Sequence, residues 1–86
     1  MEIKKELIKR EIAGETVLIP VGKAVYDSNG LFALNEVGAF IWELLPRVED
    51  PQRILEAVLA EYDVTEDEAK ADILQFLNDL EKLGIL

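Results

Sequence analysis

Apolar and polar residues follow two different periods along this chain. Up to residue 34 they alternate in short runs, as in half-buried strands, and from residue 36 apolar residues recur every three or four positions, as in amphipathic helices. The pattern predicts strands at about 7–12, 16–20 and 31–34, and helices at about 36–45, 51–62 and 66–83. We therefore expect an α+β, winged-helix-like fold in a single domain of residues 1–86, with a small N-terminal antiparallel β-sheet followed by a three-helix bundle.

The connections between the predicted strands carry turn signals. Ala13-Gly14-Glu15 is expected to be the turn between the first two strands. After Pro20, Ala24-Val25-Tyr26 is compatible with a brief strand, and Asp27-Ser28-Asn29-Gly30 is rich in residues that favour turns. A calcium loop is the sharper interpretation of the same four residues, but the alternating oxygen ligands and distal glutamate of an EF-hand loop are missing. An ordinary turn is expected there.

Each predicted helix begins at a residue whose side chain can bond an unpaired first-turn amide. Asn35 precedes the first helix and Asp50 the second, and Thr65 with Glu68 forms a capping box at the third. Gly38, inside the first helix, costs about 1 kcal/mol relative to alanine unless a neighbour needs the space. We therefore expect another backbone or an aromatic ring to pack against Gly38.

The negative charge of the chain is concentrated in its helical part. Residues 1–30 carry as many cations as acids, whereas residues 31–86 carry four cations and thirteen acids, so the formal charge of −9 arises there. A protein that neutralises about 6 to 10 phosphates of a DNA duplex needs a concentrated basic face. Nucleic acid is therefore not an expected partner, although the predicted architecture resembles DNA-binding winged helices.

The composition argues against catalysis. The chain has no Cys and no His, which removes ordinary zinc sites, disulfides and the usual nucleophile pairs, and 86 residues leave little room for an internal active site. Acidic clusters such as Glu66-Asp67-Glu68 are explained by their place at a helix N-terminus. No apolar run approaches the roughly 20 residues of a membrane span, and the start of the chain lacks the apolar core of a secretion signal. We expect a cytoplasmic protein without enzymatic activity, metal or cofactor.

The strand predicted at 31–34 offers a functional hypothesis. At the edge of a small sheet, its N–H and C=O groups lack partners unless the segment 24–26 covers them. An extended peptide can pair with such an edge, while side chains of the third helix supply the pockets that select it. Trp42, Tyr62 and Phe76 are an alternative ligand site, but each lies on or beside an apolar helical stripe and is expected in the core.

Several segments resemble the protein D family of pyrroloquinoline quinone synthesis, over roughly residues 15–86. They are Leu34-Asn35-Glu36-Val37-Gly38-Ala39-Phe40-Ile41-Trp42-Glu43-Leu44-Leu45, residues 54–58 and 61–64, and the closing stretches 72–80 and 83–86. The resemblance implies a non-catalytic adaptor that binds the leader segment of a ribosomally made precursor peptide. It also implies a partner enzyme that modifies the precursor, either a radical S-adenosylmethionine enzyme or a leader peptidase.

The resemblance further implies a binding site between the last strand and the third helix. The implied peptide-binding residues are Leu31, Phe32, Ala33, Leu34, Asp72, Phe76, Asp79 and Leu83. The opposite flank of the helix, with Leu74, Leu77 and Glu81, remains an alternative. Family members that act in synthesis of the quinone cofactor lack the extra stretch 23–30. The resemblance therefore implies the leader-binding role for this chain, but not the quinone pathway. A winged-helix regulator or another protein-interaction domain is the alternative function, and a monomer or weak homodimer is expected.

Overall fold

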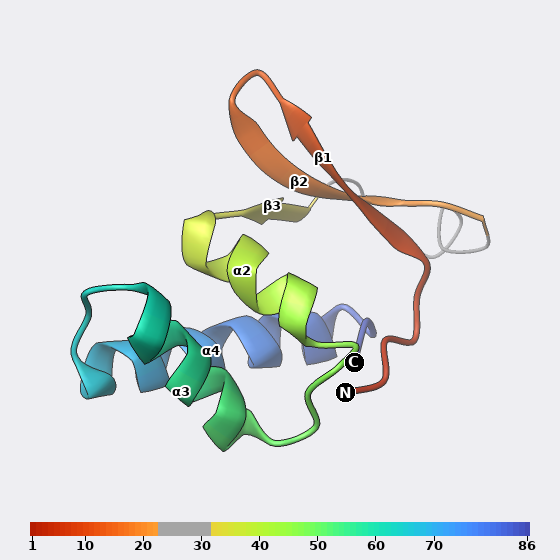
Figure 1. The fold of residues 1–86 in the computed structure, drawn as a ribbon. Helices are drawn as coiled ribbons and strands as arrows, with labels where there is room; N and C mark the ends of the chain where they lie inside the picture. Colours follow the sequence, from red (N-terminus) through yellow and green to blue (C-terminus); the bar gives the residue numbers. More distant parts are fainter. Residues whose placement is uncertain (23–31) are drawn as a thin grey trace.

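The computed structural model describes residues 1–22 and 32–86, which form three strands followed by three helices. The elements are β1 (Leu7–Ile12), β2 (Glu15–Pro20), β3 (Phe32–Leu34), α2 (Glu36–Leu44), α3 (Pro51–Glu61) and α4 (Glu66–Lys82). The strands make one antiparallel sheet in the order β1-β2-β3, and the helices lie together beneath it (Figure 1). The expected α+β arrangement is confirmed. The strand expected at Ala24–Tyr26, the turn at Asp27–Gly30 and the position of Leu31 lie outside the described residues.

The hairpin of β1 and β2 is closed by a two-residue turn. Ile12 pairs with Glu15, and the two residues between them, Ala13 (φ 52°) and Gly14 (φ 82°), both have positive φ angles. This is the pattern of a type I′ turn, whose twist matches that of the flanking strands. The expected three-residue turn was wrong by one residue. Ala13 adopts a left-handed conformation that alanine normally avoids, so that Ala13 and Gly14 alone complete the turn. Glu15 is therefore already part of β2 and pairs with Ile12.

Replacing Ala13 by asparagine is expected to stabilise the protein by about 0.5–1 kcal/mol. Asparagine tolerates the left-handed conformation better than alanine, and Asn-Gly is a preferred pair for a type I′ turn. The free energy of unfolding from urea denaturation measures the effect. Gly14→Ala is the opposing control, since it adds a second alanine at positive φ and should destabilise the hairpin. An Ala13→Asn variant no more stable than the wild type would contradict the turn assignment.

The core lies between the inner face of the sheet and the three helices. Its buried residues are Leu18, Leu34, Ile41, Trp42, Leu45, Ile54, Leu55, Val58, Ala69, Ile73, Phe76, Leu77, Leu80 and Ile85. The three helix starts predicted from capping residues are confirmed. Asn35 Oδ1 accepts a hydrogen bond from the Gly38 amide at 2.7 Å, and Asp50 Oδ1 and Thr65 Oγ1 cap α3 and α4 in the same way.

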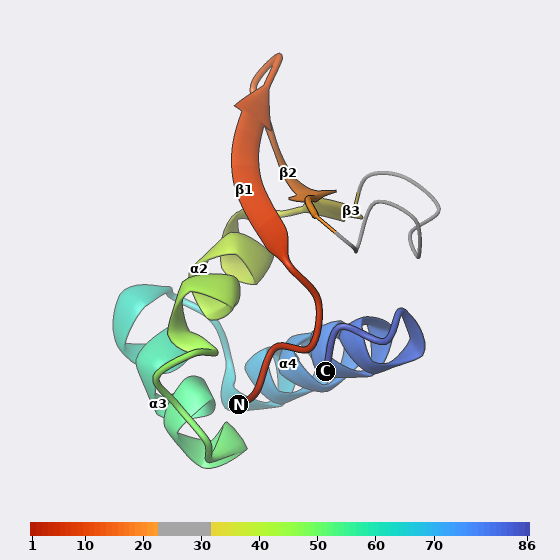
Figure 2. The ribbon, with the colours of Figure 1, turned by 90° about the vertical axis from the view of Figure 1, so that its right-hand side faces the viewer.

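The two ends of the chain are held together beside α4. Figure 2 shows the N- and C-termini beside α4. The amide of Lys4 donates to the Ile85 carbonyl at 2.7 Å, and Lys5 Nζ donates to the Leu83 carbonyl at 2.7 Å. Gly84, with φ 74°, ends the helix in a left-handed conformation and lets Ile85 fold back into the core. These contacts fix the C-terminal end of α4 relative to the segment that leads into β1.

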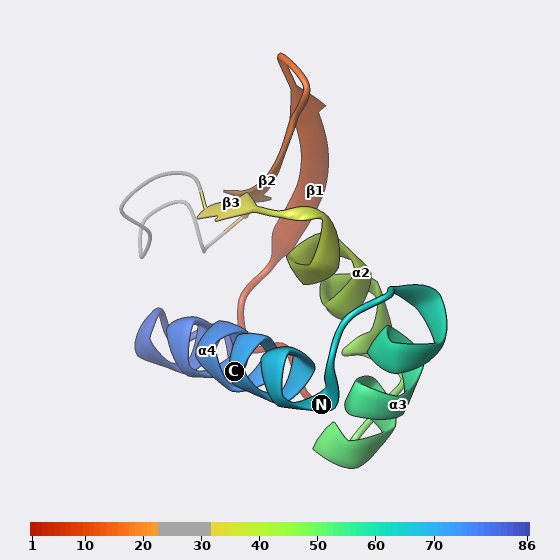
Figure 3. The same cartoon turned by 90° about the vertical axis from the view of Figure 1, so that its left-hand side faces the viewer.

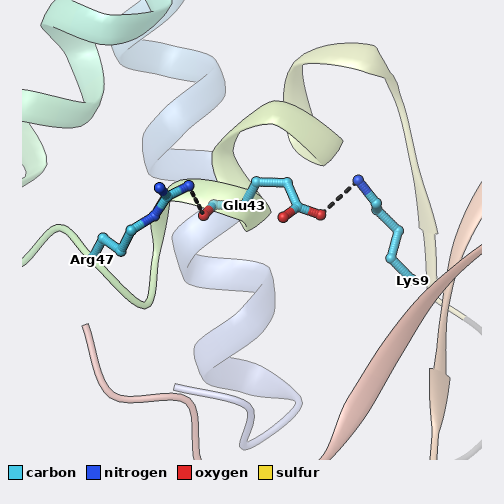
Figure 4. Close-up of polar contacts among 3 residues, drawn as sticks. All are labelled: Lys9, Glu43 and Arg47. Carbon is cyan, nitrogen blue, oxygen red and sulfur yellow. Dashed lines mark hydrogen bonds and ion pairs between the residues drawn. The ribbon is translucent and has the colours of Figure 1, made fainter.

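A surface ion pair links the hairpin to α2. Lys9 Nζ lies 2.6 Å from Glu43 Oε1, and the Glu43 carbonyl accepts a hydrogen bond from Arg47 Nη2 at 3.4 Å (Figure 4). Because both charged side chains are well exposed, the pair stabilises the fold by no more than about 1 kcal/mol. The position of the sheet over the helices therefore depends mainly on the apolar core. Of the helices described, none is long and apolar enough to cross a membrane.

Candidate functional site

The register of the sheet determines which way the main-chain groups of β3 point. In a hairpin with a two-residue turn, the residues that flank the turn form a hydrogen-bonded pair, and such pairs recur at every second residue. Ile12 and Glu15 are that flanking pair. The Val21 amide donates to the Glu6 carbonyl at 3.0 Å, and this second hydrogen-bonded pair lies six residues from the first on each strand, as the two-residue repeat requires. The odd-numbered residues of β2 therefore point their N–H and C=O groups towards β1.

The even-numbered residues of β2 consequently point their main-chain groups towards β3. Thr16 is opposite Leu34, and Leu18 is opposite Phe32. Phe32 and Leu34 thus pair with β2, whereas Ala33, between them, points its N–H and C=O away from the sheet. Among the described residues no strand pairs with this outer edge of β3. Backbone pairing with a peptide was expected at residues 31–34. Among the described residues of this stretch, only Ala33 has main-chain groups that face outward.

A groove runs along this open edge, between β3 and α4, and is closed at one end by the first turns of α2. Its volume is about 230 Å³, and it is lined by Phe32, Ala33, Leu34, Asn35, Val37, Gly38, Ile41, Asp72, Gln75, Phe76 and Asp79. Figure 3 shows β3 above α4, with the two elements running roughly side by side and α2 following at the end of β3. The groove is smaller than the roughly 300–1,000 Å³ typical of small-molecule sites. It has room for a few side chains of an extended peptide.

The floor of the groove is apolar and aromatic. The rings of Phe32 and Phe76 have centroids 6.2 Å apart at an interplanar angle of 36°, and Phe76 is only 9% exposed. A Cβ atom at Gly38 would lie 3.5 Å from Phe76 Cε1 and 3.1 Å from Asn35 Oδ1. The expectation that a ring packs against Gly38 is confirmed. The glycine brings the start of α2 close to α4 and shapes the end of the groove.

The rim contributed by α4 is polar and negatively charged. Asp72 and Gln75 are exposed and Asp79 is half-buried, and Gln75 Nε2 donates a hydrogen bond to Asp79 Oδ1 at 3.0 Å. Among the described residues, the lining contains two carboxylates and no Lys or Arg. A peptide in the groove would therefore meet an apolar floor on one side and carboxylates on the other.

The structure brings together six of the eight predicted site residues. Phe32, Ala33, Leu34, Asp72, Phe76 and Asp79 line one groove. Leu83 does not line it. Its side chain is 44% exposed at the end of α4, on the same helical stripe. Leu31 lies outside the described residues.

The opposite flank of α4 faces elsewhere. Leu77 is buried in the core, and Leu74, 60% exposed, lies in a shallow apolar depression with α3 residues such as Pro51 and Leu55. The sequence did not decide which flank of α4 lines the groove. In the structure, it is the flank that carries Asp72 and Asp79. Leu74 and Leu77 are not part of it.

Sequence reasoning missed the groove residues supplied by the start of α2 and one residue of α4. These are Asn35, Val37, Gly38, Ile41 and Gln75. Gly38 was the available signal, because a glycine inside a helix indicates a close neighbour. The identity of that neighbour depends on how α2 crosses α4, which a single sequence does not show.

Of the three aromatic residues considered as a ligand site, only Phe76 lines the groove. Trp42 is buried in the core, and Tyr62 packs against Phe40 with ring centroids 5.4 Å apart in a T-shaped arrangement. Burial raises the pKa of Tyr62, and the nearby carboxylates of Glu36 and Glu61 add to the effect. Within residues 1–22 and 32–86, no three Asp or Glu side chains are grouped so that they could hold a metal ion.

Comparison with known proteins gives a consistent picture. Residues 15–86 match the family described as coenzyme PQQ synthesis protein D (PqqD). A similar solved structure is TbiB1 in complex with the TbiA(beta) leader peptide, with 30% identity, a TM-score of 0.73, and coverage of 100% of this chain and 94% of that one. Lasso peptide synthetase B1 complexed with its leader peptide shares the fold at 21% identity and a TM-score of 0.73, covering 98% of this chain and 93% of that one. No curated protein sequence matches the chain.

Proposed function

The chain belongs to the PqqD family, and from this premise we propose that it is a non-catalytic adaptor for a ribosomally synthesised precursor peptide. The leader segment of the precursor binds as an added strand along the outer edge of β3. Its side chains enter the groove between β3 and α4. The observation that carries the proposal is the outward-facing N–H and C=O of Ala33 beside a groove with an apolar floor.

Strand addition explains why the groove and the open edge coincide. Main-chain hydrogen bonds to an edge strand provide affinity for any extended peptide, and pockets for alternate side chains provide selectivity. TbiB1, which is similar to this protein along its whole length, is known in complex with a leader peptide. The acidic rim disfavours a phosphate backbone, so the alternative of a transcriptional regulator is not retained.

The outer edge of β1 is a second open edge within the described sheet, and it is less suited to a peptide. Leu7, Lys9 and Glu11 point their main-chain groups outward there, but charged side chains flank that edge, a common protection against strand addition. No residue of the β3–α4 groove comes from β1. Peptide binding is therefore assigned to β3.

The adaptor role also requires a second partner. We infer that the bound leader is presented to an enzyme that modifies the precursor, either a radical S-adenosylmethionine enzyme or a leader peptidase, in the cytoplasm. This part of the proposal is supported by the family membership. Binding leaves the exposed faces of α3 and of the hairpin free for such an enzyme.

A selection from a random dodecapeptide library on the immobilised protein tests the proposal without knowledge of the natural precursor. We expect enrichment of peptides that, added to ¹⁵N-labelled protein, shift the amide resonances of β3 and of α4 residues 72–79. Resonances of α3 should change little, because that helix lies away from the groove. Failure to enrich any peptide, or shifts confined to α2 and α3, would contradict the proposed site.

A further inference from the structure

The charge of the groove indicates what kind of peptide it accepts. Within residues 1–22 and 32–86, Asp72 and Asp79 are the only charged side chains that line it, and neither forms an ion pair there. Asp79 receives one hydrogen bond, from Gln75, which leaves its second carboxylate oxygen available. Carboxylates at a binding site favour a partner that brings positive charge and disfavour one that brings negative charge.

The spacing of these groups matches that of an extended strand. A helix rises about 1.5 Å per residue, so Phe76 is about 6 Å along α4 from Asp72, and Asp79 is about 4.5 Å further. Alternate side chains of an extended strand are about 6.7 Å apart and face the same side. Three alternate residues of an added strand would therefore meet Asp72, the ring of Phe76 and Asp79 in turn, and long basic side chains cover the small differences in spacing.

We propose that the groove selects leader segments with the pattern basic-x-apolar-x-basic. The central apolar side chain enters the floor formed by Phe32 and Phe76, and the two flanking Lys or Arg side chains pair with Asp72 and Asp79. This inference rests on the proposed function and adds the sequence class of the peptide. It also assigns Asp72 and Asp79 as residues that determine specificity, distinct from the backbone of Ala33, which provides general affinity for extended peptides.

A charge-swap experiment tests the pattern. Two synthetic dodecapeptides share a sequence enriched by the library selection, and they differ only in carrying Lys or Glu on both sides of the apolar anchor. We expect the wild-type protein to bind the Lys peptide at least about tenfold more tightly by fluorescence anisotropy, since two attractions are replaced by two repulsions. In the double variant Asp72→Lys/Asp79→Lys this preference should reverse.

The matched control separates local pairing from overall charge. Glu49→Lys/Glu56→Lys changes the net charge by the same amount at exposed positions that do not line the groove, and it should retain the preference of the wild type. Equal loss of preference in both double variants, or no preference in the wild type, would overturn the pattern. If both peptides bind equally well and binding still depends on Ala33, the pattern is wrong and the adaptor function stands. If no peptide binds in an Ala33-dependent manner, the adaptor function itself is wrong.

Discussion

Replacing Ala33 by proline is expected to weaken peptide binding at least about tenfold while leaving the protein folded. Proline removes the outward N–H, which is worth about 0.5–1.5 kcal/mol as a hydrogen bond to the guest strand, and its ring occupies the space that this strand needs. The N–H of Ala33 does not pair with β2, so the sheet keeps its own hydrogen bonds. Anisotropy of a fluorescent library-selected dodecapeptide measures the affinity, and thermal unfolding checks the fold.

Two control variants make this result specific. Ala33→Thr keeps the N–H at an exposed strand position and should bind the peptide nearly as well as the wild type. Glu11→Pro removes an outward N–H from the β1 edge instead, and it should also leave binding unchanged. Weakened binding in Glu11→Pro together with normal binding in Ala33→Pro would show that the peptide binds to β1, and it would contradict our assignment of the site to β3.

The second large effect concerns stability. Phe76→Ala is expected to lower the free energy of unfolding by about 3–5 kcal/mol, because it leaves a cavity next to Phe32 and Gly38. The core of a protein this small buries little apolar surface, so the loss is a large share of its stability. For a domain of this size, the loss corresponds to a fall in Tm of more than about 12 °C. Thermal unfolding followed by circular dichroism measures it.

Leu74→Ala is the matched control on the same helix. Leu74 is 60% exposed, so its truncation should change stability much less than that of Phe76. Phe76→Leu keeps an apolar residue in the groove floor and remains folded, and it should still weaken peptide binding because the ring that contacts the guest side chain is lost. Similar stability losses in Phe76→Ala and Leu74→Ala would contradict the burial on which the groove depends.

The fold was predictable from the sequence because local chemistry marks most of its boundaries. Asn35, Asp50 and Thr65 each supply a side-chain acceptor where a helix begins, and the structure places the helix starts there. The predicted helix ends lie one residue beyond the observed ones, because the last residue in each case is a C-cap rather than part of the helix. The hairpin turn was missed by one residue since a left-handed alanine leaves no signal in the sequence.

The site was predicted only in outline because the sequence does not give the register of the strands. A shift of one residue in a hairpin reverses which groups of every paired strand face outward, so the sequence could not single out Ala33 from residues 31–34. The stripe of Asp72, Phe76 and Asp79 was readable from helical periodicity. Whether this stripe or the flank of Leu74 and Leu77 lines the groove depends on how α4 packs against α3 and β3, which is a tertiary property.

Amide hydrogen exchange at Ala33 tests the central claim most directly. In the free protein, we expect the Ala33 amide to exchange at least about tenfold faster than the amides of Phe32 and Leu34, which pair with β2. Saturation with a library-selected dodecapeptide should slow exchange at Ala33 and leave the amides of Leu7, Lys9 and Glu11 on the β1 edge unchanged. An Ala33 amide that exchanges equally fast with and without bound peptide would contradict strand addition at β3.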